Sequence, residues 1–142
     1  MMFPEINAST EPDKKLSVIP QTETPVVLVV EDNPDNMLTI KALLFGKCIV
    51  VEAEDGQEGI EKAQLHHPHL ILMDIALPGL NGIEVLNELR KEKSLEQIPV
   101  IAVSANAMKG DREDLLALGF DGYISKPIDS VLFDKMILEY LG

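Results

Sequence analysis

Short apolar runs alternate with longer amphipathic stretches from residue 25 to the end of the chain. The apolar runs lie at 26–30, 48–51, 70–73, 98–103 and 123–124, and the stretches of helical length at 35–45, 56–66, 82–91, 107–118 and 129–141. Short runs of consecutive apolar residues are typical of strands buried on both faces, as in a parallel sheet covered by helices. The pattern predicts four or five strands alternating with helices in an α/β sandwich.

Capping residues support the helical interpretation of two stretches. Asn33 is a favourable N-cap, and Pro34 suits the first position of a helix. Gly119 follows Leu118, where glycine commonly ends a helix.

The first 24 residues differ from the rest. They carry Pro4, Pro12 and Pro20 among polar and charged residues, without a strand or helix period. We interpret residues 1–24 as a flexible polar tail or the remnant of a linker to an upstream segment. Residues 25–142 then form a single domain, since 142 residues with 46% apolar content suffice for one core.

The charge balance excludes some classes of partner. The net charge is −12, from 24 acidic and 12 basic residues, which opposes direct contact with nucleic acid or anionic lipid. No apolar run approaches the roughly 20 residues of a membrane span, and the N-terminus does not have the pattern of a signal peptide. We therefore expect a cytoplasmic protein that binds neither DNA nor membrane.

Polar residues follow the apolar runs at several points. Glu31 and Asp32 follow the first run, Asp74 the third and Ser104 the fourth, while Lys126 comes two residues after the fifth. Ligands of open parallel sheets bind beyond the carboxyl ends of the strands. We therefore expect these five residues to converge on one edge of the sheet.

The three carboxylates of this group would repel one another, by roughly 4 kcal/mol for a close pair. Oxygen ligands without His or Cys favour Mg²⁺, Ca²⁺ or Mn²⁺, and a few carboxylates with waters and a phosphate are typical of Mg²⁺, which we choose. Beside such a cation, Asp74 could form an aspartyl phosphate while Ser104 and Lys126 stabilise the phosphoryl oxygens.

Four segments resemble the motifs of a response-regulator receiver domain. Residues 29–33 (VVEDN) resemble its acidic pair, 71–79 (ILMDIALPG) its phosphoacceptor motif, 103–105 (VSA) its hydroxyl motif and 125–127 (SKP) its lysine motif. The resemblance covers residues 25–141. It implies a doubly wound, flavodoxin-like (βα)5 sandwich with a five-stranded parallel sheet in the order 2-1-3-4-5.

The resemblance also implies roles for individual residues. Asp32 and Asp74 would bind Mg²⁺ directly, the Ala76 carbonyl would be a third ligand, and Glu31 would act through water. Asp74 would be the phosphoacceptor, with Lys126 paired to the phosphoryl group.

Ser104 and Tyr123 resemble the switch pair of the family, although Tyr123 could also be simple packing at a strand edge. The Lys126-Pro127 bond is expected to be cis, and an ordinary trans proline opening the last helix is the alternative. Ala76 and Asn106 occupy positions that, in the family this chain resembles, influence how fast the phosphoryl group is lost to water.

Gly79 and Gly82 flank Asn81 in the segment after Asp74. No Gly-Lys-Ser/Thr sequence follows them, so we interpret them as turn glycines and not as a phosphate-binding loop.

The resulting hypothesis is a phosphorylation-dependent switch of a two-component phosphorelay. A histidine kinase or histidine phosphotransfer protein would donate to Asp74, and the face formed by the fourth helix, fifth strand and fifth helix would change its affinity for a downstream protein. We expect a monomer and leave open a phosphorylation-dependent dimer. The chain could be a stand-alone regulator or the receiver of a hybrid histidine kinase.

Two other classes compete with the switch. A phosphorylation-independent interaction module would not need the full set of site residues. A turnover enzyme would need a further acid, base or cofactor loop, so we expect no enzyme beyond the phosphorylation and dephosphorylation of the chain itself.

Overall fold

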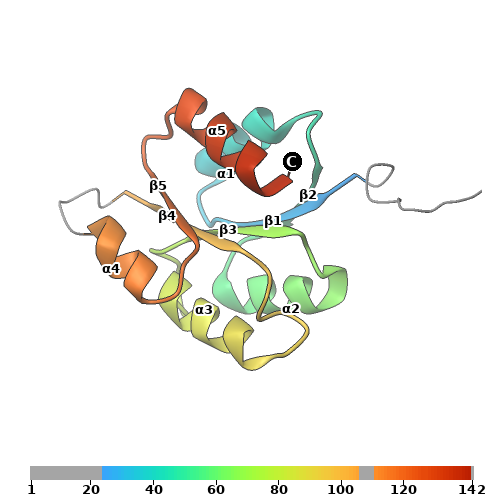
Figure 1. Cartoon of the computed structure of the whole chain (residues 1–142), viewed down its shortest axis with the longest axis vertical. Coiled ribbons are helices and arrows are strands. Elements are labelled where there is room, and N and C mark those ends of the chain that lie inside the picture. The colour runs from blue at the N-terminus through green and yellow to red at the C-terminus, as the bar shows by residue number, and fades with distance from the viewer. Residues whose placement is uncertain (1–23, 106–110, 142) are drawn as a thin grey trace, which may run out of the picture.

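The computed structural model describes residues 24–105 and 111–141, in which strands and helices alternate (Figure 1). The strands are β1 (Val26–Val30), β2 (Ile49–Ala53), β3 (Leu70–Asp74), β4 (Val100–Ser104) and β5 (Gly122–Ser125). The helices are α1 (Pro34–Leu44), α2 (Gly56–His66), α3 (Gly82–Lys91), α4 (Asp111–Ala117) and α5 (Ser130–Leu141). Residues 1–23 of the predicted tail and Asn106 lie outside the described residues.

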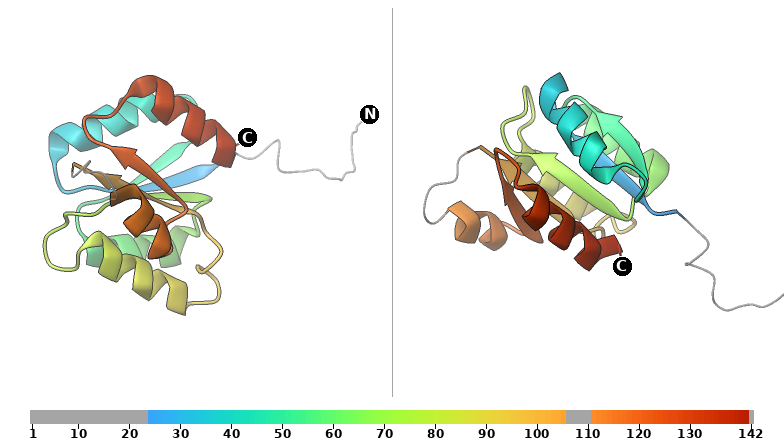
Figure 2. Two further views of the ribbon diagram at one scale, coloured as in Figure 1. Left: turned by 60° about the vertical axis from the view of Figure 1, so that its left-hand side comes forward. Right: turned by 90° about the horizontal axis from the view of Figure 1, so that it is seen from above.

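The strands form one parallel sheet in the order β2-β1-β3-β4-β5. This order confirms the doubly wound, flavodoxin-like (βα)5 sandwich. Figures 1 and 2 show α1 and α5 on one face of the sheet and α2 and α3 on the other. Because all strands are parallel, their carboxyl ends lie along the same edge.

Two hydrophobic clusters hold the helices to the sheet. Leu28, Ile71 and Ala102 belong to the cluster under α2 and α3, whereas Val29 and Leu72 belong to the cluster under α1 and α5. Neighbouring residues of one strand thus enter opposite clusters, as the pleat requires. This explains why the inner strands are continuously apolar.

The edge strand β2 departs from the prediction. It runs to Ala53 instead of ending at Val51, and includes Glu52, whose side chain is exposed. An edge strand pairs on one side only, so it tolerates a charged residue that a central strand would not. The predicted strand was too short because the apolar run stops at the charged Glu52, whereas β2 continues to Ala53.

Side-chain caps fix the starts of two helices next to the carboxyl edge. Asn33 caps α1 as predicted, with its side-chain oxygen accepting from the backbone N–H of Asp35 at 2.9 Å and of Asn36 at 3.0 Å. Asn81 and Glu84 form a reciprocal capping box at the start of α3. None of the described helices combines the length and apolar composition that crossing a bilayer requires.

Candidate functional site

The carboxyl ends of four neighbouring strands carry the predicted site residues. Glu31 and Asp32 directly follow β1, and Lys126 directly follows β5. Asp74 and Ser104 are the last residues of β3 and β4. The sheet therefore places all five residues at one edge, as expected from the positions of the apolar runs.

Backbone pairing continues through the site. Asp74 lies opposite Val103, and Ser104 lies opposite Ser125. The N–H of Lys126 donates to the Ser104 carbonyl at 2.8 Å. Asp74 and Ser104 are therefore part of their strands, each of which ends one residue later than predicted. Rigid backbone thus carries both side chains.

Three carboxylates form an acidic cluster. One oxygen from each of Glu31, Asp32 and Asp74 lies within 4.8 Å of the others. Glu31 and Asp74 are buried, at 2% and 4% exposed, whereas Asp32 is exposed. Backbone donors orient the buried pair: Asn33 N–H donates to Glu31 Oε2 at 3.2 Å, and Ala76 N–H donates to Asp74 Oδ1 at 3.0 Å.

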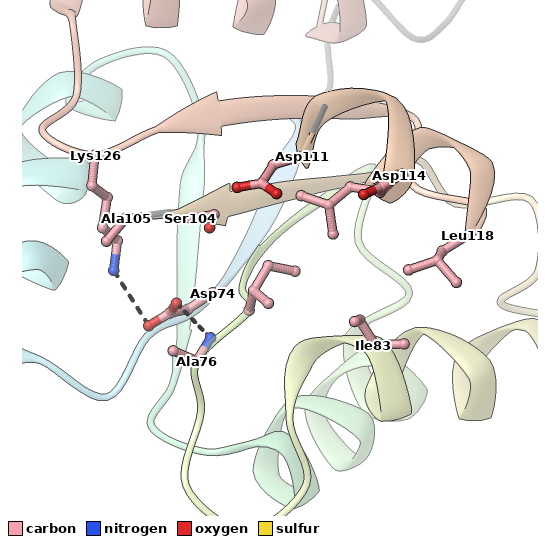
Figure 3. A pocket seen from close by; sticks show the side chains of 11 residues that line it. Asp74, Ala76, Ile83, Ser104, Ala105, Asp111, Asp114, Leu118 and Lys126 are labelled. Atoms are coloured by element: carbon pink, nitrogen blue, oxygen red, sulfur yellow. Dashed lines mark hydrogen bonds and ion pairs between the residues drawn. The ribbon is translucent and has the colours of Figure 1, made fainter. Parts of the chain in front are cut away.

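The Lys126 ammonium bridges the two buried carboxylates. It lies 2.9 Å from Glu31 Oε1 and 3.3 Å from Asp74 Oδ2, as Figure 3 shows for Asp74. The ammonium is thus the charged partner of the buried Glu31 Oε1. The Lys126-Pro127 peptide bond is cis.

Burial and mutual charge shift the proton affinities of this pair. Desolvation raises the pKa of Glu31, and the Lys126 ammonium and the Asn33 N–H only partly oppose it. For Lys126, burial alone would lower the pKa, but the carboxylates of Glu31 and Asp74 together raise it. Lys126 is therefore a stable cation that compensates part of the negative charge of the cluster.

The donor set fits a small, hard cation. Carboxylate oxygens from three residues lie together without any His or Cys, and two of these residues, Glu31 and Asp74, are buried. Such oxygen clusters suit Mg²⁺, Ca²⁺ or Mn²⁺ better than zinc. Ala76 lines the space beside Asp74 and Lys126.

A cavity of about 530 Å³ opens beside Asp74 (Figure 3). Ser104 and Lys126 border it on the strand side, and Asp111 and Asp114 border it from α4. Sequence reasoning did not identify these two aspartates as cavity residues. Acidic residues are ordinary in the first turn of a helix, so their positions gave no signal that they face a cavity.

Tyr123 is half-buried and packs against the cluster under α2 and α3. It borders a second cavity, of about 260 Å³, between β5 and α5. Burial raises the pKa of its hydroxyl, and the negative charge of Asp111 adds to the shift. Both earlier interpretations, a switch residue and a packing residue, fit this position.

Comparison with known proteins identifies the family. The family model described as response regulator receiver domain matches residues 27–138. The polar-differentiation response regulator DivK of Brucella ovis is 44% identical over 120 residues, which cover 84% of this chain and 98% of DivK.

Solved structures agree. The receiver domain of the sensor histidine kinase PA1611 from Pseudomonas aeruginosa, solved with a magnesium ion in its active site cleft, is 33% identical with a TM-score of 0.77, over 84% of this chain and 99% of that one. The Saccharomyces cerevisiae complex of Ypd1 with the Ssk1 receiver domain matches at 30% identity and a TM-score of 0.73, over 84% of this chain and 91% of the matched chain. Vibrio cholerae CheY4 matches at 22% identity and a TM-score of 0.76, over 83% of this chain and 99% of CheY4. At this identity it supports the fold alone. The chain therefore belongs to the response-regulator receiver family and is a receiver domain of two-component signalling.

Proposed function

We propose that the chain is a phosphorylation-dependent switch whose phosphoacceptor is Asp74. One observation carries the proposal: a buried carboxylate at the end of a central strand, 3.3 Å from the Lys126 ammonium and within 4.8 Å of two further carboxylates. Asp74 is thus held beside one fixed cation and in a cluster suited to a second. Phosphoryl transfer depends mainly on such positioning and charge neutralisation.

The proposed donor is the phosphohistidine of a histidine kinase or a histidine phosphotransfer protein. A carboxylate oxygen of Asp74 attacks the phosphorus, the bond between phosphorus and the imidazole nitrogen breaks, and the imidazole leaves and takes up a proton from water. Lys126 then pairs with the phosphoryl oxygens, and the hydroxyl of Ser104 donates to one of them.

Magnesium is the proposed cofactor. Asp32, Asp74 and the Ala76 carbonyl would hold it directly, and Glu31 through water. When bound, Mg²⁺ would supply positive charge that offsets the charge of the transferring phosphoryl group. The magnesium ion named for the PA1611 receiver domain supports this choice, as does the oxygen-only donor set of this chain.

The output is a change in affinity for a downstream protein at the face formed by α4, β5 and α5. Ser104 and Tyr123 couple this face to Asp74, and phosphorylation shifts the balance between two conformations. A phosphorylation-dependent dimer through this face is a second form of the same output. The chain turns over no external substrate: its chemistry is limited to gaining and losing its own phosphoryl group.

Two relatives support the choice of partner class. DivK is named as a response regulator, and the Ssk1 receiver was solved with the histidine phosphotransfer protein Ypd1. A phosphorylation-independent interaction module remains the second candidate, because the interaction faces of the fold do not themselves require chemistry at Asp74.

Phosphotransfer from a histidine phosphotransfer protein loaded with labelled phosphate tests the proposal. We expect label on the wild-type chain in the presence of Mg²⁺ and none on Asp74→Asn. Asp55→Asn is the matched control: Asp55 caps α2 through its side chain, and asparagine caps equally well, so labelling should persist.

Label on another residue of Asp74→Asn would refute the assignment of the phosphoacceptor. A wild-type chain that neither takes label from any donor tested nor binds beryllofluoride with Mg²⁺ would instead favour the phosphorylation-independent module.

A further inference from the structure

Gly82, the first residue of α3, lies directly against the backbone of Asp74. A Cβ atom at Gly82 would lie 2.5 Å from the Asp74 carbonyl oxygen and 2.9 Å from the Ile75 Cα, whereas ordinary contacts begin near 3.4 Å. Both neighbours are backbone atoms of the segment that holds the candidate phosphoacceptor. The peptide between Asp74 and Ile75 therefore occupies the space that any other side chain at Gly82 would fill.

Hydrogen bonds close the loop between β3 and α3 at this point. Ile75 N–H donates to the Val103 carbonyl at 3.1 Å, which holds the loop to β4. Gly82 N–H donates to the Ile75 carbonyl, also at 3.1 Å, which holds the first turn of α3 to the start of the loop. The position of this first turn thus determines where the backbone on either side of Ile75 lies.

The first turn of α3 is itself fixed by the capping box. Asn81 Oδ1 accepts from Glu84 N–H at 2.9 Å, and Glu84 Oε1 accepts from Asn81 N–H at 3.0 Å. Figure 3 shows the loop below Asp74 and Ala76 leading toward α3, on which Ile83 is labelled. The helix start is therefore a rigid support under the segment from Asp74 to Ala76.

We infer that Gly82 is a positioning residue for the chemistry at Asp74. Because it has no side chain, the start of α3 can approach the Asp74-Ile75 peptide closely, and this approach sets both the Asp74 carboxylate and the Ala76 carbonyl. A Cβ at Gly82 would have to move that peptide by about 1 Å, and a misplacement of that size in an active site can cost about 100-fold in rate. The inference rests on the proposed function of Asp74.

Gly56 provides a matched control within the chain. It also begins a helix and is buried, and its Cβ would lie 2.6 Å from Cγ2 of Val85 on α3 and 2.7 Å from the backbone carbonyl oxygen of Leu80. The crowding is comparable, but it acts on Leu80 at the far end of the loop and on a side chain of α3, and on no backbone atom from Asp74 to Ala76. Gly56→Ala therefore reproduces the loss of stability without crowding the phosphoacceptor backbone.

The test compares the full-length wild type, Gly82→Ala and Gly56→Ala. Mg²⁺ affinity is measured by NMR titration, phosphorylation by the rate of mass gain with acetyl phosphate, and stability by thermal unfolding. We expect Gly82→Ala to weaken Mg²⁺ binding at least tenfold, as loss of a positioning contact typically does, and to slow phosphorylation about 100-fold. Gly56→Ala should be destabilised to a similar degree, yet lose far less Mg²⁺ affinity than Gly82→Ala, since its Cβ would contact no backbone atom from Asp74 to Ala76.

The outcomes separate the two proposals. A wild-type chain that neither binds Mg²⁺ nor gains mass would overturn the proposed function. The inference alone would be overturned if the wild type is active and Gly82→Ala is indistinguishable from Gly56→Ala in Mg²⁺ affinity and phosphorylation rate.

If Gly82→Ala does not fold, Asn81→Ala is the deciding variant. It removes only the cap, and we expect Mg²⁺ affinity to fall by about threefold or more as the first turn loosens. Unchanged affinity in folded Asn81→Ala would count against the inference.

Discussion

The Lys126 ammonium lies closer to Glu31 than to Asp74, at 2.9 Å from Oε1 of the former and 3.3 Å from Oδ2 of the latter. The lysine is therefore paired most closely with a carboxylate of the candidate metal cluster. A cation entering that cluster meets Lys126 as a competing positive charge. The same lysine is the group that we propose to stabilise the phosphoryl oxygens.

Replacing Lys126 by methionine should separate these two effects. At about pH 8, where free carboxyl groups are ionised, we expect Mg²⁺ affinity to rise by roughly tenfold, because about 1.4 kcal/mol of charge repulsion is removed. Phosphorylation by a small phosphodonor should nevertheless slow, because the phosphoryl oxygens lose their cationic partner. Calorimetric Mg²⁺ titration and the rate of mass gain measure the two quantities.

Lys126→Arg is the control, since it keeps the positive charge and should leave Mg²⁺ affinity close to that of the wild type. Weaker Mg²⁺ binding by Lys126→Met than by wild type would contradict the idea of competition. It would indicate that the lysine helps to assemble the cluster.

Acidification should weaken Mg²⁺ binding through Glu31. Burial raises the pKa of Glu31 above its ordinary value of 4.5, so Glu31 takes up a proton at a higher pH than an exposed glutamate would. Metal binding requires the deprotonated ligand, so Mg²⁺ affinity should begin to fall while exposed carboxylates are still ionised. Titrations from about pH 5 to about pH 8 on wild type and Glu31→Gln check this, and the variant should show the smaller dependence on pH.

The raised pKa of Glu31 also makes the free energy of unfolding of the metal-free chain depend on pH. The unfolded chain releases the Glu31 proton near the ordinary pKa of 4.5, before the folded chain does. The contribution of Glu31 to the free energy of unfolding is thus most favourable at acidic pH and decreases as the pH rises through the raised pKa. A free energy of unfolding that is equally dependent on pH in Glu31→Gln, measured without metal, would contradict this assignment.

The positions of the site residues could be predicted because they depend on strand ends. In a buried parallel sheet the strands are apolar throughout, so the first polar residue after each run marks the carboxyl edge. Glu31 and Asp74 were found in this way. Strand order was not available from the apolar pattern, since it depends on how the helices cross over the sheet, and it came from the resemblance to receiver domains.

Other features could not be predicted because they depend on contacts between distant segments. The spacing of the motifs gives no distance from Lys126 to Glu31 or to Asp74, which the side-chain conformations decide. Gly82 was interpreted as a turn glycine, and only its 2.5 Å approach to the Asp74 carbonyl oxygen gives it a further role. Asp114 carried no signal because its exposure to the cavity depends on where α4 packs.

The N-cap of α1 should contribute to stability without affecting chemistry. Asn33→Ala removes the side-chain acceptor for the N–H groups of Asp35 and Asn36, and we expect it to lower the free energy of unfolding by about 1 kcal/mol. The bond from Asn33 to Glu31 uses the backbone N–H, so Mg²⁺ affinity should not change. Urea unfolding measures the loss, and Asn33→Ser should restore most of it. Equal losses in both variants would mean that the cap does not stabilise α1.

Arg90 joins three segments at the opposite edge of the sheet from Asp74. Its guanidinium donates to the carbonyls of Glu96 at 3.0 Å, Ile98 at 2.9 Å and Gly119 at 3.3 Å, and to Asp121 Oδ2 at 2.9 Å. Asp121 Oδ2 also accepts from the N–H of Val100 at 2.8 Å. The arginine thus ties α3 to the segment before β4 and to the turn before β5.

Arg90→Ala should lower the free energy of unfolding by about 2 kcal/mol, because several hydrogen bonds to a charged donor are lost. The ion pair itself adds little, since the Asp121 side chain is 42% exposed. Arg90→Lys should recover only a small part of the lost free energy of unfolding, because a lysine ammonium cannot reproduce the planar fork that reaches several acceptors at once.

A double-mutant cycle with Asp121→Ala, followed by urea unfolding, should give a coupling free energy near 1 kcal/mol. The rate of phosphorylation should stay at the wild-type value in Arg90→Lys, since no contact of Arg90 reaches the carboxyl edge; a slower rate would show that the two edges of the sheet are coupled.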